Sequence, residues 1–202
     1  MLDTYGRKYI NPLINLISKK MIYFKFTAIN ITVIALILGV MSAITLYFDN
    51  WILSLILLWA SGLFDAVDGE VARNTNTQSM IGAQIDIVCD RIVEIMFIWA
   101  IALKNENVIY ELLLLMSMIL ISITIFLTTG IISKNKTKKS FYYQSGLMER
   151  TEGFIMFSFM IIFKKFLKQT IIIYALLIFV TIIQRMVETI KINSEVKNEK
   201  VN

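Results

Sequence analysis

Histidine is absent from this sequence of 202 residues, and proline and cysteine each occur only once. The single cysteine, Cys89, excludes an internal disulfide and any metal site built from several cysteines of one chain. Charged residues make up only 17% of the chain, whereas 57% are hydrophobic, above the roughly 45–50% that is usual in soluble proteins. The composition therefore favours an integral membrane protein over a protein with a soluble core.

Long apolar stretches are abundant. The segment TAINITVIALILGVMSAITLYF at 27–48 carries no basic or acidic residue and can cross a hydrocarbon layer about 30 Å thick. We therefore predict an all-α integral membrane protein whose six transmembrane helices lie near 27–48, 51–73, 79–103, 108–133, 152–163 with a turn on either side, and 169–190. The fifth is the shortest, because its uncharged run GFIMFSFMIIF needs flanking residues or local thinning of the bilayer to complete a crossing.

The chain is expected to form a single domain over 1–202. Residues 1–26 place apolar side chains at helical spacing with lysines between them, as is typical of an amphipathic helix that lies in the membrane interface. The six-helix bundle is expected over 27–190, and the remaining tail over 191–202 is polar.

The distribution of lysine and arginine predicts the orientation. With the N-terminus inside, fifteen basic residues fall in inside segments and four in outside loops, with Arg91 left out because it lies within a span. The positive-inside rule then puts both termini in the cytoplasm. The membrane is expected to be the plasma membrane of a prokaryote. The net charge of +5 follows from this topology and from anionic lipid headgroups, so no nucleic acid is expected as a partner.

Acidic and small residues follow one face of the second expected span and one face of the third. Residues three or four apart in a helix share a face. The first stripe consists of Asp65, Asp68, Gly69 and Ala72, and the second of Gly82, Asp86, Asp90 and Glu94. The short polar turn NTNTQS makes the two helices antiparallel neighbours, so the stripes can face each other and bring the carboxylates together near the cytoplasmic side.

Carboxylates inside a membrane cost at least a few kcal/mol each unless they are neutralised or hydrated. An all-oxygen site without histidine or thiolate suits divalent Mg²⁺ or Mn²⁺ better than Zn²⁺. Gly69 and Gly82 would let a bulky ligand approach the backbone, and Arg73 could meet a phosphate. Two alternatives are a packing or assembly role for the aspartates and a cation-coupled transporter, although the sequence has no repeated halves.

The same residues resemble the signature of the CDP-alcohol phosphotransferase family, D-x2-D-G-x2-A-R-x8-G-x3-D-x3-D. All eight fixed positions agree, and they are Asp65, Asp68, Gly69, Ala72, Arg73, Gly82, Asp86 and Asp90. The six-span layout with an interfacial N-terminal helix is similar to the family over nearly the whole chain. One departure lies in the first span, where TAINIT at 27–32 replaces the T-P-N-x-x-T pattern and keeps only its two threonines.

The resemblance implies a membrane enzyme of phospholipid biosynthesis that transfers a phosphatidyl-type group from a CDP-linked lipid, commonly CDP-diacylglycerol, to a polar alcohol and releases CMP. It implies two divalent cations held by the aspartates, with Asp90 also serving as the base. It implies a homodimer as well. The residues that it implies for cytidine diphosphate are Gly69, Ala72, Arg73, Gly82 and Thr32. Arg91 and Glu94 lie outside the signature and are expected to pair with each other or within a network of charged groups.

The acceptor alcohol is predicted from the segment KKSFYYQSGLMERTEGF at 138–154, which carries an E-R-x-E pattern comparable to members that use inositol phosphate. Lys138, Lys139 and Arg150 could hold an acceptor phosphate, or they could simply belong to a positive inside loop. Glycerol 3-phosphate or inositol phosphate is favoured over serine or another small alcohol. A binding-only relative without catalysis is a further alternative, which the intact signature disfavours.

Overall fold

The computed structural model describes residues 2–133 and 146–199, and every regular element in these ranges is helical. The elements are α1 (Leu2–Tyr23), α2 (Ala28–Tyr47), α3 (Trp51–Asn74), α4 (Met80–Lys104), the short 3₁₀ helix η1 (Glu106–Val108), α5 (Ile109–Ser133), α6 (Arg150–Ile162), the 3₁₀ helix η2 (Lys164–Phe166) and α7 (Leu167–Glu199). The prediction of an all-helical chain is confirmed.

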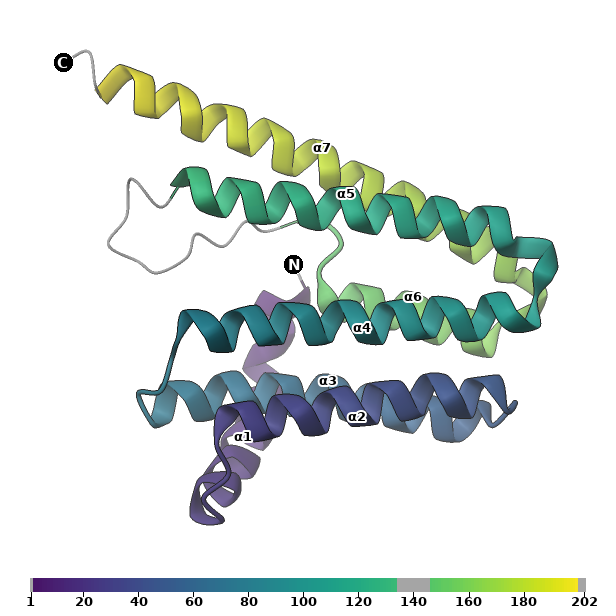
Figure 1. The fold of residues 1–202 in the computed structure, drawn as a ribbon, viewed down its shortest axis with the longest axis horizontal. Helices are drawn as coiled ribbons and strands as arrows, with labels where there is room; N and C mark the ends of the chain where they lie inside the picture. The colour runs from purple at the N-terminus through teal and green to yellow at the C-terminus, as the bar shows by residue number, and fades with distance from the viewer. Residues whose placement is uncertain (1, 134–145, 200–202) are drawn as a thin grey trace.

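Helices α2 to α7 run back and forth along one direction, and α1 crosses them at one end of the bundle (Figure 1). The turn between α3 and α4 lies at this same end, which we call the aspartate end. The turns that contain η1 and η2 lie at the opposite end. Helices α5 and α7 pack on each other to one side of the group formed by α2, α3, α4 and α6.

Four of the six expected spans are long and apolar enough to cross a membrane, and they are Ala28–Tyr47, Trp51–Asn74, Glu106–Ile131 and Lys164–Lys191 within the described residues. Helix α4 has the length of a span, but it carries Asp86, Asp90, Arg91 and Glu94. Helix α6 has 13 residues, or about 20 Å, which is shorter than the hydrocarbon layer. The structure thus supports a membrane protein, and the full count of six crossings stays a prediction.

Small residues allow α2, α3 and α4 to pack closely. A Cβ added at Gly39 of α2 would lie only 2.8 Å from Cγ1 of Val93 in α4, so only glycine fits there. Buried serine hydroxyls tie α2 to α3, because Ser42 donates to the carbonyl of Ser54 at 2.6 Å and Ser61 donates to the carbonyl of Ala35 at 2.8 Å. Small side chains and such hydrogen bonds are the usual means of joining helices in a membrane.

Two apolar clusters fix the helices around the site. The larger one fills the bundle toward the opposite end, where the rings of Phe97 and Phe157 lie 5.0 Å apart and join α4 to α6. The smaller one holds α1 and α2 against α3 through Ile14, Ile31, Val67 and Val71. A helix was expected in the N-terminal segment and is present, and its position at a membrane surface stays a prediction.

Candidate active site

The two acidic stripes meet as the sequence predicted. Asp65 and Asp68 project from α3, and one carboxylate oxygen of each lies within 4.8 Å of the other and of an oxygen of Asp86 from α4. Asp90 lies one turn further along α4. We call these four aspartates the acidic cluster.

The connection between α3 and α4 is stabilised locally. The backbone N–H of Thr75 bonds to the carbonyl of Val71 and ends α3, and Asn76 takes a left-handed conformation with φ of 53°, which asparagine tolerates well. Ser79 then caps α4 by accepting a hydrogen bond from the backbone N–H of Gly82 at 3.0 Å. These polar turn residues set the register in which the two stripes face each other.

Thr32 of α2 lies beside the acidic cluster. Its hydroxyl lies 2.5 Å from Oδ2 of Asp68 and 3.1 Å from the carbonyl of Ala28. A hydroxyl has one proton, and the shorter contact to a carboxylate is the stronger hydrogen bond. Both Thr32 and Asp68 are 6% exposed, so the threonine orients a buried carboxylate. Its predicted contact with a nucleotide would have to be made from this position.

Arg150, the first residue of α6, lies among the aspartates. Its Nη1 forms ion pairs with Asp65 and, at 2.6 Å, with Asp90, and it lies 4.0 Å from Asp86. The guanidinium also lies over the ring of Phe154, 5.5 Å from the centroid. Among the described residues, Arg150 is the cation that forms ion pairs with the acidic cluster, so the four carboxylates leave an excess of negative charge. Lys138 and Lys139, the other residues predicted to hold the acceptor, lie outside the described residues.

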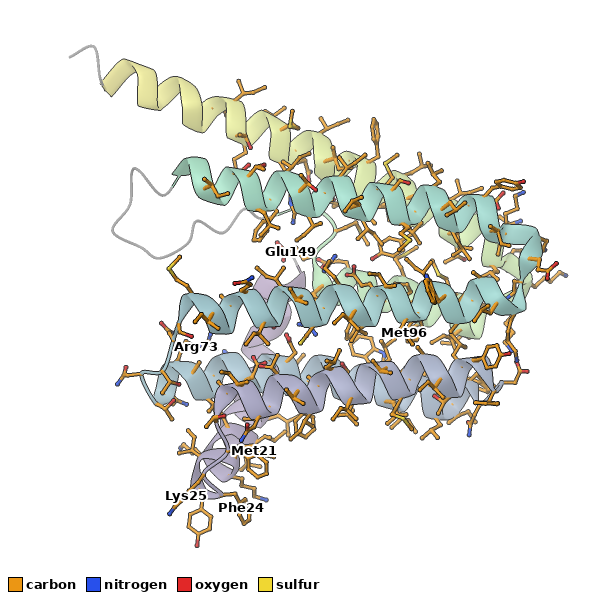
Figure 2. All side chains as sticks on the ribbon, viewed as in Figure 1. Met21, Phe24, Lys25, Arg73, Met96 and Glu149 are labelled. Atoms are coloured by element: carbon orange, nitrogen blue, oxygen red, sulfur yellow. The ribbon has the colours of Figure 1, made fainter. Side chains whose placement is uncertain are left out.

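The remaining signature residues surround the aspartate end. A Cβ added at Gly69 would meet only the guanidinium of Arg73, at 3.5 Å or more, and one at Gly82 would meet only Oγ of Ser79. Packing between helices therefore does not require glycine at either position. Ala72 is half-buried, and Arg73 is exposed beside the α3–α4 turn (Figure 2), where its Nη2 pairs with Glu70 at 2.7 Å.

A cavity of about 300 Å³ extends from the acidic cluster between α4, α5, α6 and α7. Its wall includes Asp86, Asp90, Arg91, Glu94, Ser122, Glu149, Arg150, Tyr174 and Arg185. Figure 2 shows Glu149 between the levels of α4 and α5, at the start of α6. The expected pairing of Arg91 with Glu94 is confirmed, at 2.5 Å.

Sequence reasoning missed Arg185 and Tyr174 of α7. Arg185 was counted only as an inside charge, yet its Nη1 donates to the carbonyl and to Oγ of Ser122 in α5, at 3.0 and 2.9 Å, and its guanidinium covers the ring of Phe126. A lone arginine in an otherwise apolar stretch was the available signal. Tyr174 gave no signal, because tyrosine is common in membrane helices.

Comparison with known proteins finds relatives of this chain. A family model described as CDP-alcohol phosphatidyltransferase matches residues 26–185. A bifunctional IPC transferase and DIPP synthase of Aquifex aeolicus is 40% identical over 79 residues, which are 39% of this chain and only 18% of that relative. The phosphatidylinositol phosphate synthase of Corynebacterium glutamicum is 29% identical over 165 residues, which cover 77% of this chain and 72% of that protein.

A solved structure has the same fold. The phosphatidylinositol phosphate synthase of Mycobacterium tuberculosis, in complex with manganese and citrate, matches with a TM-score of 0.67 and 19% identity over 87% of this chain and 88% of that one. The same protein with CDP-DAG bound matches with a TM-score of 0.67 and 18% identity. At such identities the likeness concerns the arrangement of the helices.

Proposed function

This chain belongs to the CDP-alcohol phosphatidyltransferase family, and from that premise we propose that it transfers a phosphatidyl-type group from CDP-diacylglycerol, or a similar CDP-linked lipid, to a phosphorylated polyol and releases CMP. The observation that carries the proposal is the convergence of carboxylate oxygens from Asp65, Asp68 and Asp86 within 4.8 Å, at the edge of a cavity large enough for a small acceptor.

The acidic cluster fits divalent cations. Oxygen ligands lie about 2.1 Å from a Mg²⁺ ion, so ligands of one ion are at most about 4.2 Å apart, and the three carboxylate oxygens, all within 4.8 Å of one another, could converge on an ion with small shifts. Two ions, Mg²⁺ or Mn²⁺, would be held by Asp65, Asp68, Asp86 and Asp90. When bound, they polarise the pyrophosphate of the donor and neutralise the charge that develops on the departing CMP. The excess of carboxylates over arginine supports this assignment.

Asp90 is the proposed general base. It lies in the wall of the cavity rather than among the three most closely grouped carboxylates, so an acceptor in the cavity can reach it. The acceptor oxygen forms a bond to the phosphorus that carries the lipid, the bond from that phosphorus to CMP breaks, and the hydroxyl proton passes to the carboxylate of Asp90. Arg150, 2.6 Å away, keeps this carboxylate oriented toward the cavity.

The nucleotide is proposed to lie against the aspartate end of α3 and α4. The cytidine diphosphate could approach the helix backbone closely at Gly69, Ala72 and Gly82, whose side chains are absent or small. Packing inside the protein does not require glycine at Gly69 or Gly82. The exposed Arg73 would exchange its partner Glu70 for a phosphate oxygen. Thr32 would act mainly through Asp68, which it holds in place.

The acceptor is proposed to be inositol phosphate. Arg150 and Arg185 both line the cavity, and guanidinium groups bind phosphate in a bidentate manner. Serine, the alternative, carries no phosphate that would use them. Glycerol 3-phosphate satisfies the charge but is smaller. The names of the relatives in Corynebacterium glutamicum and Mycobacterium tuberculosis point to an inositol-containing acceptor as well.

The cellular setting remains part of the proposal. The distribution of basic residues favours both termini and the active site in the cytoplasm. A prokaryotic plasma membrane is proposed because relatives occur in Aquifex aeolicus and Corynebacterium glutamicum. Homodimerisation rests on the family resemblance. A cation-coupled transporter was open on the residues alone, but the family is one of transferases. The intact signature disfavours a relative that only binds.

The decisive experiment measures CMP release by the purified protein in detergent, with CDP-diacylglycerol, Mg²⁺ or Mn²⁺, and a panel of inositol 1-phosphate, glycerol 3-phosphate, inositol and serine. We expect release that requires both the metal and inositol 1-phosphate. Release with serine alone would replace the proposed acceptor. No release with any acceptor, together with no binding of CDP, would contradict the transferase assignment for this chain.

A further inference from the structure

The part of the cavity farthest from the aspartate end carries polar groups that the transfer step does not use. They are Arg91, Glu94 and Tyr174, which we call the cavity floor. Glu94 lies one turn, or about 6 Å, beyond Asp90 along α4. On α7, Tyr174 lies eleven residues, or about 16 Å, from Arg185. The cavity thus continues past the proposed base into the interior of the bundle.

Tyr174 is held rigidly with its hydroxyl at the floor. The residue is 4% exposed, and its ring packs edge to face on Phe157 at 5.7 Å between centroids. The hydroxyl lies so close to Gly153 of α6 that a Cβ there would be 2.7 Å from it. The hydroxyl makes no hydrogen bond with any residue that the structure describes. Tyr174 lines the cavity, so its hydroxyl is available to a ligand that enters the cavity.

Arg91 and Glu94 complete the floor. Nη1 of Arg91 pairs with Oε2 of Glu94 at 2.5 Å, and Nε of Arg91 is buried without a hydrogen-bond partner in the described part of the chain. The floor therefore offers donors from the guanidinium, an acceptor carboxylate and a hydroxyl that can do both. This combination suits neighbouring hydroxyl groups of a ligand, whereas the carboxylate of Glu94 disfavours a second phosphate.

We propose that the cavity floor binds hydroxyl groups of the acceptor beyond the one that reacts, and that Tyr174 is the residue that distinguishes a cyclic polyol phosphate from a three-carbon one. The inference rests on the proposed function. A three-carbon acceptor that reaches Asp90 with its hydroxyl and Arg150 or Arg185 with its phosphate has no atoms left for the floor. A six-membered polyol ring presents hydroxyls on its far side and fills the space beyond Asp90.

The test compares Tyr174→Phe with Tyr110→Phe, an exposed tyrosine at the opposite end of the bundle. The variant Tyr174→Phe should raise KM for inositol 1-phosphate about tenfold, the effect of one hydrogen bond, and leave KM for CDP-diacylglycerol unchanged. Both variants should unfold at the temperature of the parent protein. Equal acceptor KM values in the two variants would overturn the proposal.

Acceptor analogues sharpen the result. At least one inositol phosphate that lacks a single hydroxyl should bind the parent protein more weakly than inositol 1-phosphate does. The variant Tyr174→Phe should bind this analogue no more weakly than the parent protein binds it. If the parent releases CMP with glycerol 3-phosphate only, the role of the floor is wrong while the transferase reaction stands. If no acceptor gives CMP, the proposed function fails first, and the role of the floor fails with it.

Discussion

Charged side chains are arranged differently at the two ends of the bundle. At the opposite end, Asp49 accepts from Lys104 and, at 3.2 Å, from Lys164, while Glu111 pairs with Lys168 at 2.7 Å. These groups lie at turns and helix ends, where the side chain of Asp49 is 64% exposed. At the aspartate end, the acidic cluster lies between helices and has Arg150 as its partner among the described residues.

The difference between the two ends distinguishes charged residues that stabilise the fold from charged residues that serve the reaction. Exposed ion pairs contribute only about 0–1 kcal/mol, and the groups that form them can be hydrated when a partner is lost. Carboxylates between membrane helices cannot be hydrated as freely, so their excess over arginine predicts additional cations. Substitutions at the aspartate end should therefore change chemistry and metal binding, and those at the opposite end should change neither.

The largest effect is expected from Asp90→Asn. The amide keeps the size of the side chain but cannot accept the acceptor proton, so CMP release should fall about 10²- to 10⁴-fold. Binding of CDP, measured by calorimetry with Mn²⁺ present, should persist because Asp65, Asp68 and Asp86 remain. The matched control at the opposite end is Asp49→Asn, which should retain full turnover. Retained turnover in Asp90→Asn would rule out its role as the base.

A second test removes the arginine of the acidic cluster. In Arg150→Met the carboxylates of Asp65 and Asp90 lose their ion pairs, and breaking a buried pair costs about 3–5 kcal/mol of unfolding free energy. Thermal unfolding in detergent without metal should show this loss, and added Mn²⁺ should stabilise the variant more than the parent. Lys164→Met, which breaks the exposed pair with Asp49 at the opposite end, should cost far less. Equal losses in the two variants would contradict the contrast between the ends.

A third substitution, Thr32→Val, tests the support of a single carboxylate. It removes the 2.5 Å hydrogen bond to Asp68 at nearly constant volume. Losing a hydrogen bond that orients a metal ligand typically lowers metal affinity about 10- to 100-fold, so the Mn²⁺ concentration for half-maximal CMP release should rise by that factor. Thr45→Val, at the end of α2 away from the site, serves as the control. An unchanged Mn²⁺ requirement would mean that Thr32 only packs between helices and does not support the metal ligand Asp68.

The helices and the acidic cluster could be predicted because both depend on local pattern. Apolar runs interrupted by turns identify helices, and aspartates four residues apart must share a face once the chain is helical. The turn at Asn76 and Ser79 is short enough to fix α3 and α4 as neighbours. The number of membrane crossings could not be established from the sequence, because α4 has carboxylates where a typical span has apolar residues and α6 is shorter than a full span.

The other side of the cavity depends on contacts between residues distant in sequence. Arg150 was predicted either to hold an acceptor phosphate or to belong to a positive inside loop. Its place between Asp65 and Asp90 follows from the way α6 docks on α3. Tyr174 and Arg185 reach the cavity only because α7 packs against α5 and α6. The same limit applies at the opposite end, where Asp49 meets Lys164 from a segment more than a hundred residues away.

The smallest effect is expected from Asp49→Asn. Asp49 has φ of 62°, which asparagine adopts equally well, so the substitution removes charge without straining the turn. Hydrogen bonds and attraction from Lys104 and Lys164 hold the pKa of this carboxyl below its ordinary value of 3.8. A lowered pKa adds stability above the ordinary value, and this stability is lost as pH falls through the lowered one. The unfolding temperature of the variant should therefore lie slightly below that of the parent at pH 6, and the gap should close below about pH 4. A gap that widened in acid would mean that the aspartate carries a proton in the folded protein, and the opposite end would then resemble the aspartate end.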